Sequence, residues 1–277
     1  MSNLKDKLAT KVNNGALEAT NGKPKTIKQW ITTMTPEIKK ALPSVITPER
    51  FTRMALTAVS SNPKLAECTP ESFMGSLMQA AQLGLEPNTP LGQAYLIPFK
   101  NKGINEAQFQ IGYKGLIDLA HRSGEFKMID AHEVYENDDF DYAYGLEPVL
   151  KHVPRLDGRG NVIAYYAVFT LKNGGHGFVV MSKEDIQKHA STFSQAYKSG
   201  YASPWKSNFD EMAKKTVLKK VLKYAPIKTE FVRELAQDET IKKEIKEDMT
   251  EVESAFSFVD MEQVQEAEFK ESVAENQ

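Results

Sequence analysis

Residues 91–124, LGQAYLIPFKNKGINEAQFQIGYKGLIDLAHRSG, contain the change of hydrophobic period that decides the fold class. In 91–100 and 106–113 apolar residues alternate with polar ones, a pattern typical of half-buried strands. The intervening NKGIN is a short turn, so the two segments are expected to form an antiparallel hairpin. From Lys114 the period becomes helical, and Gly124 is suited to end the helix.

On the N-terminal side, residues 29–84 have the pattern of a helical lobe. The tripeptide Thr-Pro-Glu occurs at 35–37, 47–49 and 69–71. Threonine favours the N-cap, proline the first helical position, and glutamate complements the helix dipole in the first turn. We therefore expect each tripeptide to start a helix. Residues 1–28 contain six lysines and two acids, and we expect a flexible basic arm there.

On the C-terminal side, strand patterns continue to residue 181 in the segments KMIDAHEVY, DFDYAY, PVLKHV, VIAYYAVFTL and HGFVVM. Asn173-Gly174-Gly175 is a turn between the last two segments. Ser182 with Asp185 predicts the start of another helix. Helices, then an antiparallel sheet built from hairpins, then further helices predict an α+β fold.

Residues 203–226, SPWKSNFDEMAKKTVLKKVLKYAP, predict a long basic helix near 204–225 with six lysines and two acids. On a helical wheel, the apolar residues in the first part of this segment and those in its second part lie on opposite faces. Lys219 and Lys223 lie on the face of the first set, whereas Lys214 projects into the face of the second set. One interpretation is a core helix with a hydrated lysine face. The other is a lysine row that lines a groove for single-stranded nucleic acid, with Trp205 at its end.

The charge is distributed unevenly along the chain. The net charge is −2 overall, but residues 1–230 contain 30 basic and 23 acidic residues, whereas 231–277 contain five and 14. We expect one core domain over 29–230. Because few apolar residues remain in 231–277, we expect an acidic, largely disordered C-terminal tail there. A basic body of this kind favours a polyanionic partner.

Several functional classes lack their sequence signals. The single cysteine, Cys68, excludes an internal disulfide, and the five histidines have no zinc-ligand spacing. Neither a secretory signal nor an apolar run long enough to span a membrane occurs, so a cytoplasmic protein is expected. The chain contains no Gly-Lys-Ser or Gly-Lys-Thr, which argues against an ATP-driven recombinase with a phosphate-binding loop.

Three segments in order, GLEPNTPLGQAYLIPF, FQIGYKGLIDLAHRSG and SPWKSNFDEMAKKTVLKKVLKYAP, resemble the RecT family of phage and prophage single-strand DNA annealing proteins. The resemblance covers about residues 30–226. Within the family, the sequence is similar to a RecT protein from a prophage of a Gram-positive bacterium. The GYKG motif, Pro204-Trp205 and the basic helix are more distantly similar to the lambda phage Beta protein.

The resemblance implies ATP-independent annealing of complementary strands, without covalent catalysis, in phage-type homologous recombination. It also implies a homo-oligomer, either a ring or a helical filament, that binds single-stranded DNA and the annealed duplex. A partner exonuclease and a host single-strand binding protein are expected partners, and no membrane is expected. No cofactor is expected, and magnesium would at most assist annealing without a dedicated site.

Candidate DNA-binding residues follow from the basic helix, the hairpin and the corner between hairpin and helix. The lambda relative has positive or potentially positive side chains at positions matching Lys214, Lys215 and Lys223, whereas it has glutamine at the position of Lys220. Packing is the alternative role for the aromatic candidates, and solvation is the alternative for the lysines. The full set is Lys100, Gln108, Gln110, Tyr113, Lys114, Arg122, Trp205, Lys206, Lys214, Lys215, Lys219 and Lys223.

Two other functions remain open. The acidic cluster in residues 135–142, YENDDFDY, could hold magnesium for a nuclease that uses Asp138–Asp141, although such clusters are more often solvated loops. Alternatively, the lysines could bind the acids of a partner in a phage structural or assembly protein. The annealing function is the one that we expect, and it needs neither catalytic residues nor metal ligands.

Overall fold

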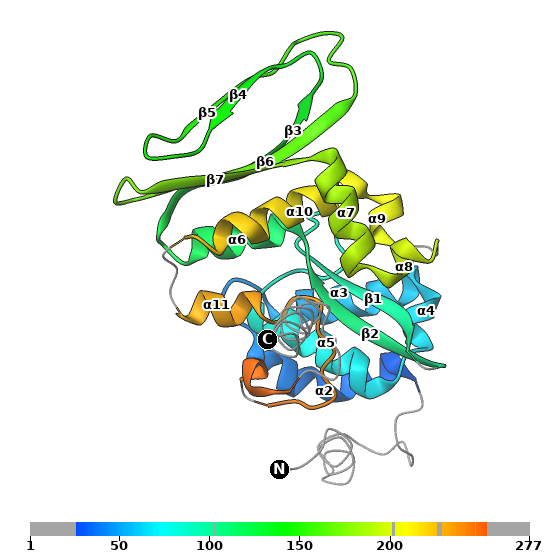
Figure 1. Cartoon of the computed structure of the whole chain (residues 1–277). Helices are drawn as coiled ribbons and strands as arrows, with labels where there is room; N and C mark the ends of the chain where they lie inside the picture. Colours follow the sequence, from blue (N-terminus) through cyan, green and yellow to red (C-terminus); the bar gives the residue numbers. More distant parts are fainter. Residues whose placement is uncertain (1–25, 102, 201–202, 226–228, 247, 254–277) are drawn as a thin grey trace, which may run out of the picture. The chain divides into compact units, whose positions relative to one another are not determined.

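The structure, a computed structural model, describes residues 26–253 apart from 102, 201–202, 226–228 and 247 (Figure 1). The α+β fold is confirmed, with helices at the N-terminal side and antiparallel strands after them. The chain forms two compact units rather than one core over 29–230. One unit contains the residues up to Gly115 and those from Val232 onward, and the other is Leu116–Phe231.

The first unit begins with four helices: α2 (Ile27–Ala41), α3 (Pro48–Ser61), α4 (Pro63–Ala66) and α5 (Pro70–Leu83). The side chain of Thr47 accepts a hydrogen bond from the Arg50 N–H and caps α3, and Pro48 occupies its first turn. Thr69 and Pro70 begin α5 in the same order. The second and third Thr-Pro-Glu tripeptides therefore start helices, as predicted.

The first Thr-Pro-Glu tripeptide does not start a helix, which corrects that prediction. Pro36 lies inside α2, whose N-cap is Thr26 in a capping box with Gln29. The Thr35 hydroxyl donates to the carbonyl of Ile31, as a residue within a helix can. The buried face of α2 extends past the proline, so tertiary packing outweighs the local signal for a helix start. This face consists of Ile27, Trp30, Ile31, Met34 and Ile38.

The predicted hairpin is present as β1 (Ala94–Asn101) and β2 (Ile104–Ile111), which pair antiparallel and pack on α5. Helix α6 (Tyr113–Arg122) follows directly, with Gly124 after it at φ +81°. The two glycines of the GYKG motif occupy positions at which there is no room for a side chain. A Cβ on Gly112 would lie 2.1 Å from the carbonyl oxygen of Gly92, and one on Gly115 would lie 2.1 Å from that of Gln93.

The C-terminal part of the chain returns to the first unit through α11 (Thr229–Leu235). The described residues of 237–252 pack there, and Phe109 of β2 donates its N–H to the Thr240 carbonyl. The apolar side chains of this segment are buried: Ile241, Ile245, Met249 and Val252, of which Met249 lies in the short helix η1 (Met249–Glu251). The expected disorder is therefore wrong for the described residues of 235–253, whereas 247 and 254–277 lie outside them.

The second unit is built on the antiparallel sheet β3–β6–β7, formed by β3 (Phe126–Tyr135), β6 (Val162–Leu171) and β7 (His176–Ser182). Helices α7 (Lys183–Phe193) and α10 (Phe209–Leu222) pack on it (Figure 1). The hairpin of β4 (Asp139–Ala143) and β5 (Val149–Val153) also contacts it, since Phe140 stacks on Tyr166 and Tyr144 on Phe178. Ser182 caps α7 with Asp185, as predicted.

The long basic helix predicted near 204–225 is two helices, α9 (Pro204–Ser207) and α10, which corrects that expectation. They follow the short α8 (Gln195–Lys198). Asn208 separates them with a non-helical backbone (φ −141°, ψ 56°), although its N–H and carbonyl still bond to both helices. Because of this break, the direction of Trp205 relative to the lysines of α10 is not the one that a single continuous helix would give. Within the part of the chain that the structure describes, no helix is long and apolar enough to span a membrane.

Candidate nucleic-acid interface

Helix α10 packs on β3, β6 and β7, and its apolar residues from Ala213 onward are buried. Asp210 and Glu211 lie in its first turn and Lys219 and Lys220 in its last turn. This order of charge complements the helix dipole. The sequence therefore stabilises α10 as a helix and places positive charge at its C-terminal end.

Lys214 projects toward the apolar side of its helix because an acid of the sheet lies there. Its Nζ lies 2.8 Å from Glu133 Oε1 of β3, and the two side chains are 13% and 25% exposed. Burial raises the pKa of Glu133, but the hydrogen bond of Lys214, a backbone hydrogen bond and the charge of Lys214 together outweigh that effect and hold the pKa below its usual range. In this conformation Lys214 forms an ion pair with the sheet rather than lying on an open lysine face.

The other lysines of the expected row differ in exposure. Lys215 is buried at 3%, Lys219 is half-buried, and Lys223 is exposed just after α10. Lys206 of α9 is exposed, and its ammonium donates to the Gly200 carbonyl at 2.5 Å. The row is therefore not a uniform basic face, and Lys206 and Lys223 are its most accessible members.

Trp205 is 7% exposed and lies in an aromatic cluster of the second unit. Its ring centroid is 5.7 Å from that of Phe209, 6.2 Å from that of His189 and 6.3 Å from that of Tyr197. Edge and tilted contacts at these distances are favourable packing geometries. Packing thus accounts for the position of Trp205, and a base could stack on it only after the cluster opened.

In the first unit, Lys100 of β1 is exposed, and Tyr113 and Lys114 begin α6. The Lys114 ammonium lies 5.9 Å from the centroid of the half-buried Tyr113 ring, which is within cation–π range. Gln108 is buried, and its amide donates to the Glu239 carbonyl at 2.9 Å. Gln110 is half-buried and donates to Gln108 at 3.0 Å.

Gln108, a candidate DNA-binding residue of the hairpin, therefore does not lie on an open face of β2. The C-terminal segment lies against that strand and takes the Gln108 amide as a hydrogen-bond donor. Arg122, at the end of α6, is exposed and pairs with Asp118 at 2.7 Å. The twelve candidates thus belong to both units, and their role in DNA binding stays a prediction.

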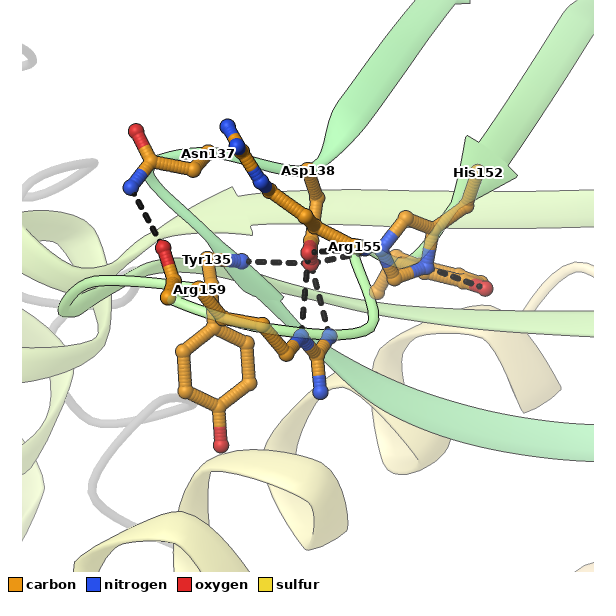
Figure 2. Close-up of polar contacts among 8 residues, drawn as sticks. Tyr135, Asn137, Asp138, His152, Arg155 and Arg159 are labelled. Carbon is orange, nitrogen blue, oxygen red and sulfur yellow. Dashed lines mark hydrogen bonds and ion pairs between the residues drawn. The ribbon is translucent and has the colours of Figure 1, made fainter.

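The acidic cluster that suggested a nuclease has a structural role around Asp138 (Figure 2). The Asp138 side chain is inaccessible to solvent and receives Arg159 Nε and Nη2 at 3.0 and 2.7 Å. The N–H groups of Tyr135 and Arg155 also donate to it, and His152 Nε2 lies 3.0 Å away. These hydrogen bonds, that of Arg159 foremost, hold the pKa of Asp138 far below its usual range.

Other acids of the cluster also have partners within the protein. Glu136 accepts hydrogen bonds from Asn161, and Asp139 pairs with Lys151 at 2.6 Å. Across residues 26–253, with the gaps stated above, no group of three histidine, cysteine or acidic residues could hold a metal ion. Arg159 and His152 could not be recognised from the sequence as partners of Asp138, because they lie in a different loop and strand of the chain.

Comparison with known proteins identifies the class to which this α+β fold and its lysine-bearing helix belong. The model of the RecT family matches residues 49–253. Protein RecT of Escherichia coli strain K12 is 40% identical over 210 residues, which cover 74% of this chain and 77% of that protein. The uncharacterized protein YqaK of Bacillus subtilis strain 168 is 33% identical over 214 residues, 77% of this chain and 71% of YqaK.

The chain belongs to the RecT family, as its sequence motifs indicated. Membership supports a single-strand annealing protein that acts in recombination. The match extends beyond residue 226 and includes the C-terminal segment that packs on β2. The part of the chain after 230 is therefore not outside the family, which corrects the sequence-based boundary.

Proposed function

We propose that this protein binds single-stranded DNA and anneals complementary strands without ATP, as an oligomer, in phage-type homologous recombination. The observation that carries the proposal is the RecT family match, which includes both the hairpin-to-helix corner and α10. No step requires covalent chemistry. Lysines that neutralise phosphates lower the repulsion between two strands and release counterions.

Exposed lysines from both units are the first candidates for phosphate contacts, namely Lys100, Lys114, Lys206 and Lys223. An ammonium group is a compact charge that binds phosphate without the fixed geometry of a guanidinium fork. Such contacts exchange readily, which suits a protein that must let strands test their pairing. Sequence specificity then comes from base pairing between the strands, so the protein needs no contacts that read bases.

The finer parts of the proposal rest on the family resemblance and the sequence. The chain lacks Gly-Lys-Ser and Gly-Lys-Thr, so the phosphate-binding loop of ATP-driven recombinases has no counterpart in it. Neighbouring protomers of a ring or filament would align long stretches of DNA for pairing. An exonuclease that exposes single strands and the host single-strand binding protein are the proposed partners, in the cytoplasm.

A fluorescence annealing assay tests this function. Two complementary oligonucleotides labelled with donor and acceptor dyes are mixed with the protein, without ATP, and energy transfer is followed over time. We expect the protein to accelerate annealing of complementary strands and to leave non-complementary strands unpaired. An annealing rate equal to that without protein, over a range of salt and protein concentrations, would contradict the proposal.

The same reactions separate the rival functions. Denaturing gels of labelled DNA with magnesium would show shortened products if the acidic cluster supported a nuclease. Asp138, Glu136 and Asp139 already bind partners within the protein. We therefore expect the labelled DNA to keep its length. An assembly protein whose lysines bind a partner's acids would not bind strands in a manner that grows with DNA length and weakens with salt.

A further inference from the structure

We propose that Glu133 and Lys214, together with Tyr165 and Asp210, are positioning residues that fix α10 on the sheet, and that Lys214 does not itself bind phosphate. This inference deepens the proposed function, because α10 carries lysines of the candidate DNA-binding set. It assigns a role to three residues that the sequence did not single out, and it changes the role expected for Lys214.

The four residues form two matched contacts between a helix and two neighbouring strands. Asp210 and Lys214 are four residues apart on α10, so they lie on one side of the helix. Glu133 and Tyr165 lie directly opposite each other in the β3–β6 pairing. The Tyr165 hydroxyl donates to Asp210 Oδ1 at 2.5 Å, and Lys214 Nζ lies 2.8 Å from Glu133 Oε1.

Three of the four side chains, those of Tyr165, Lys214 and Glu133, are costly to leave without a partner, whereas Asp210 is exposed. The Tyr165 ring is fully buried, and burial together with the hydrogen bond to Asp210 raises the pKa of its hydroxyl, so the hydroxyl remains a donor. Lys214 and Glu133 are mostly buried, and an unpaired charge there would be strongly unfavourable. The pairs therefore oppose any position of the helix that separates their members.

The apolar contacts of α10 set its buried face, but they fix its rotation less closely than the polar contacts do. Ala213, Val217, Leu218, Val221 and Leu222 are buried and select that face, whereas hydrophobic burial is non-directional and allows small rotations about the helix axis. Such rotations would turn Lys219 and Lys223 away from their present direction. The two polar contacts thus add the directional constraints that hold the later lysines where they point.

Removing both charges at once separates positioning from phosphate binding. Lys214→Met alone leaves the Glu133 carboxylate without this partner, so weaker strand binding and a lower Tm are expected. Adding Glu133→Leu replaces the ion pair by two apolar side chains, a change that often keeps or raises stability. We expect the double variant to recover the Tm of the wild type and to bind single strands within about two-fold of it, since a compensated pair is not additive.

The dependence of affinity on salt gives the deciding measurement. If Lys214 contacts a phosphate, the double variant still lacks that contact, and its salt slope falls by about 0.7 on single strands. A folded double variant with this lower slope and weak binding would overturn the inference. If the double variant does not fold, the exchanged pair Glu133→Lys with Lys214→Glu replaces it, and failure to restore both Tm and affinity would overturn the inference as well.

Two controls keep this test separate from that of the proposed function. Lys223→Met, at an exposed position, is expected to lower the salt slope by about 0.7 without changing the Tm. Tyr165→Phe removes the second contact and is expected to lower affinity and Tm while leaving the slope unchanged, and an unaltered Tm would count against the inference. If the wild type fails to bind single strands, the proposed function fails, whereas recovery of the Tm in the double variant still tests the positioning role.

Discussion

At the scale of single residues, Trp205 is the aromatic side chain for which packing and DNA binding make opposite predictions. Its contacts with His189, Tyr197 and Phe209 favour packing. We expect Trp205→Ala to lower the free energy of unfolding by about 3–5 kcal/mol, as for other large buried aromatics. Urea denaturation followed by circular dichroism measures this change.

A conservative control sharpens the Trp205 prediction. Trp205→Phe retains most of the ring contacts and should lose much less stability than the alanine variant. If Trp205→Ala instead unfolds at the same urea concentration as the wild type and binds DNA more weakly by about 1–3 kcal/mol, the ring stacks on a base. That result would assign Trp205 to the DNA interface despite its burial.

The contribution of Asp138 to stability is expected to depend on pH. Because its pKa is lowered in the folded state, its contribution to stability is present above the pKa of the unfolded chain and is lost as the pH falls through the folded value. Asp138→Asn should therefore lower the Tm at neutral pH. The difference from the wild type should shrink progressively below about pH 4, the usual pKa of aspartate, because the unfolded chain takes up the proton there while the folded carboxylate stays charged.

Thermal scans of both proteins between neutral and acidic pH test this dependence. Asp141→Asn is a matched control, since Asp141 belongs to the same cluster but is exposed. It should change the Tm little at any pH. A difference between Asp138→Asn and the wild type that stayed constant through the acidic range would show that the carboxylate charge does not stabilise this loop.

The residues whose surroundings the sequence failed to predict share one cause. Lys214 and Gln108 have polar partners, Glu133 and Glu239, that are distant in the sequence. Helical or strand periodicity gives the direction of a side chain relative to its own element only. It predicted correctly that Lys214 projects toward the apolar side of its helix, but it contains no information on which acid lies there.

At the scale of elements, local signals were reliable where they agreed with burial. The hairpin, the helix starts at Thr47, Thr69 and Ser182, and the strands up to residue 182 were predicted from turn chemistry and alternation. The start at Thr35 was wrong because a continuous buried face carries α2 through Pro36. The break at Asn208 has no proline or glycine to mark it, so periodicity alone extended one helix across it.

The packing of the C-terminal segment on α5 depends on the absence of a side chain at Gly75. A Cβ at this position would lie 2.0 Å from the carbonyl oxygen of Lys242, which is far too close. Gly75→Ala must therefore displace the segment or α5. We expect a loss of stability of about 1–3 kcal/mol or more, the range for overpacked interiors.

Hydrogen exchange identifies which of the two moves after Gly75→Ala. The N–H groups of Phe109 and Ile111 donate to Thr240 and Asp238 of the C-terminal segment. If the segment is displaced, these two amides should exchange faster than in the wild type, while amides that bond within the β1–β2 hairpin stay protected. Unchanged exchange at Phe109 and Ile111 would contradict the role of Gly75 in this contact.

At the scale of the whole molecule, the chain leaves the first unit within α6 and returns to it within α11. A discontinuous unit of this kind cannot be inferred from composition, because the returning segment looks like a charged tail when it is considered alone. Its apolar residues are few, but they contact a hydrophobic surface provided by residues far earlier in the chain. The expected boundary at 230 therefore divided one packed unit into a core and a tail.

Two truncations distinguish the packed part of this segment from the residues after it. A protein ending at Ala236 lacks Thr240, Ile241 and Lys242, and it leaves the outer edge of β2 and the Gln79 amide without their partners. It should be strongly destabilised, which would not be the case if residues 231–277 were a disordered tail. A protein ending at Glu253 retains every described contact and should melt like the full chain.

The truncation at Glu253 also tests whether the remaining acidic residues compete with DNA. Residues 254–277 lie outside the described part of the chain and contain six acids and one lysine. If this charge binds the basic surface, its removal should tighten binding of short oligonucleotides at low salt. The gain should diminish as salt rises, since ions screen the tail and the DNA alike. Fluorescence anisotropy over a salt series measures both effects. Equal affinities at low salt for the full chain and the protein ending at Glu253 would exclude competition and leave solubility or the docking of a partner as the role of these residues.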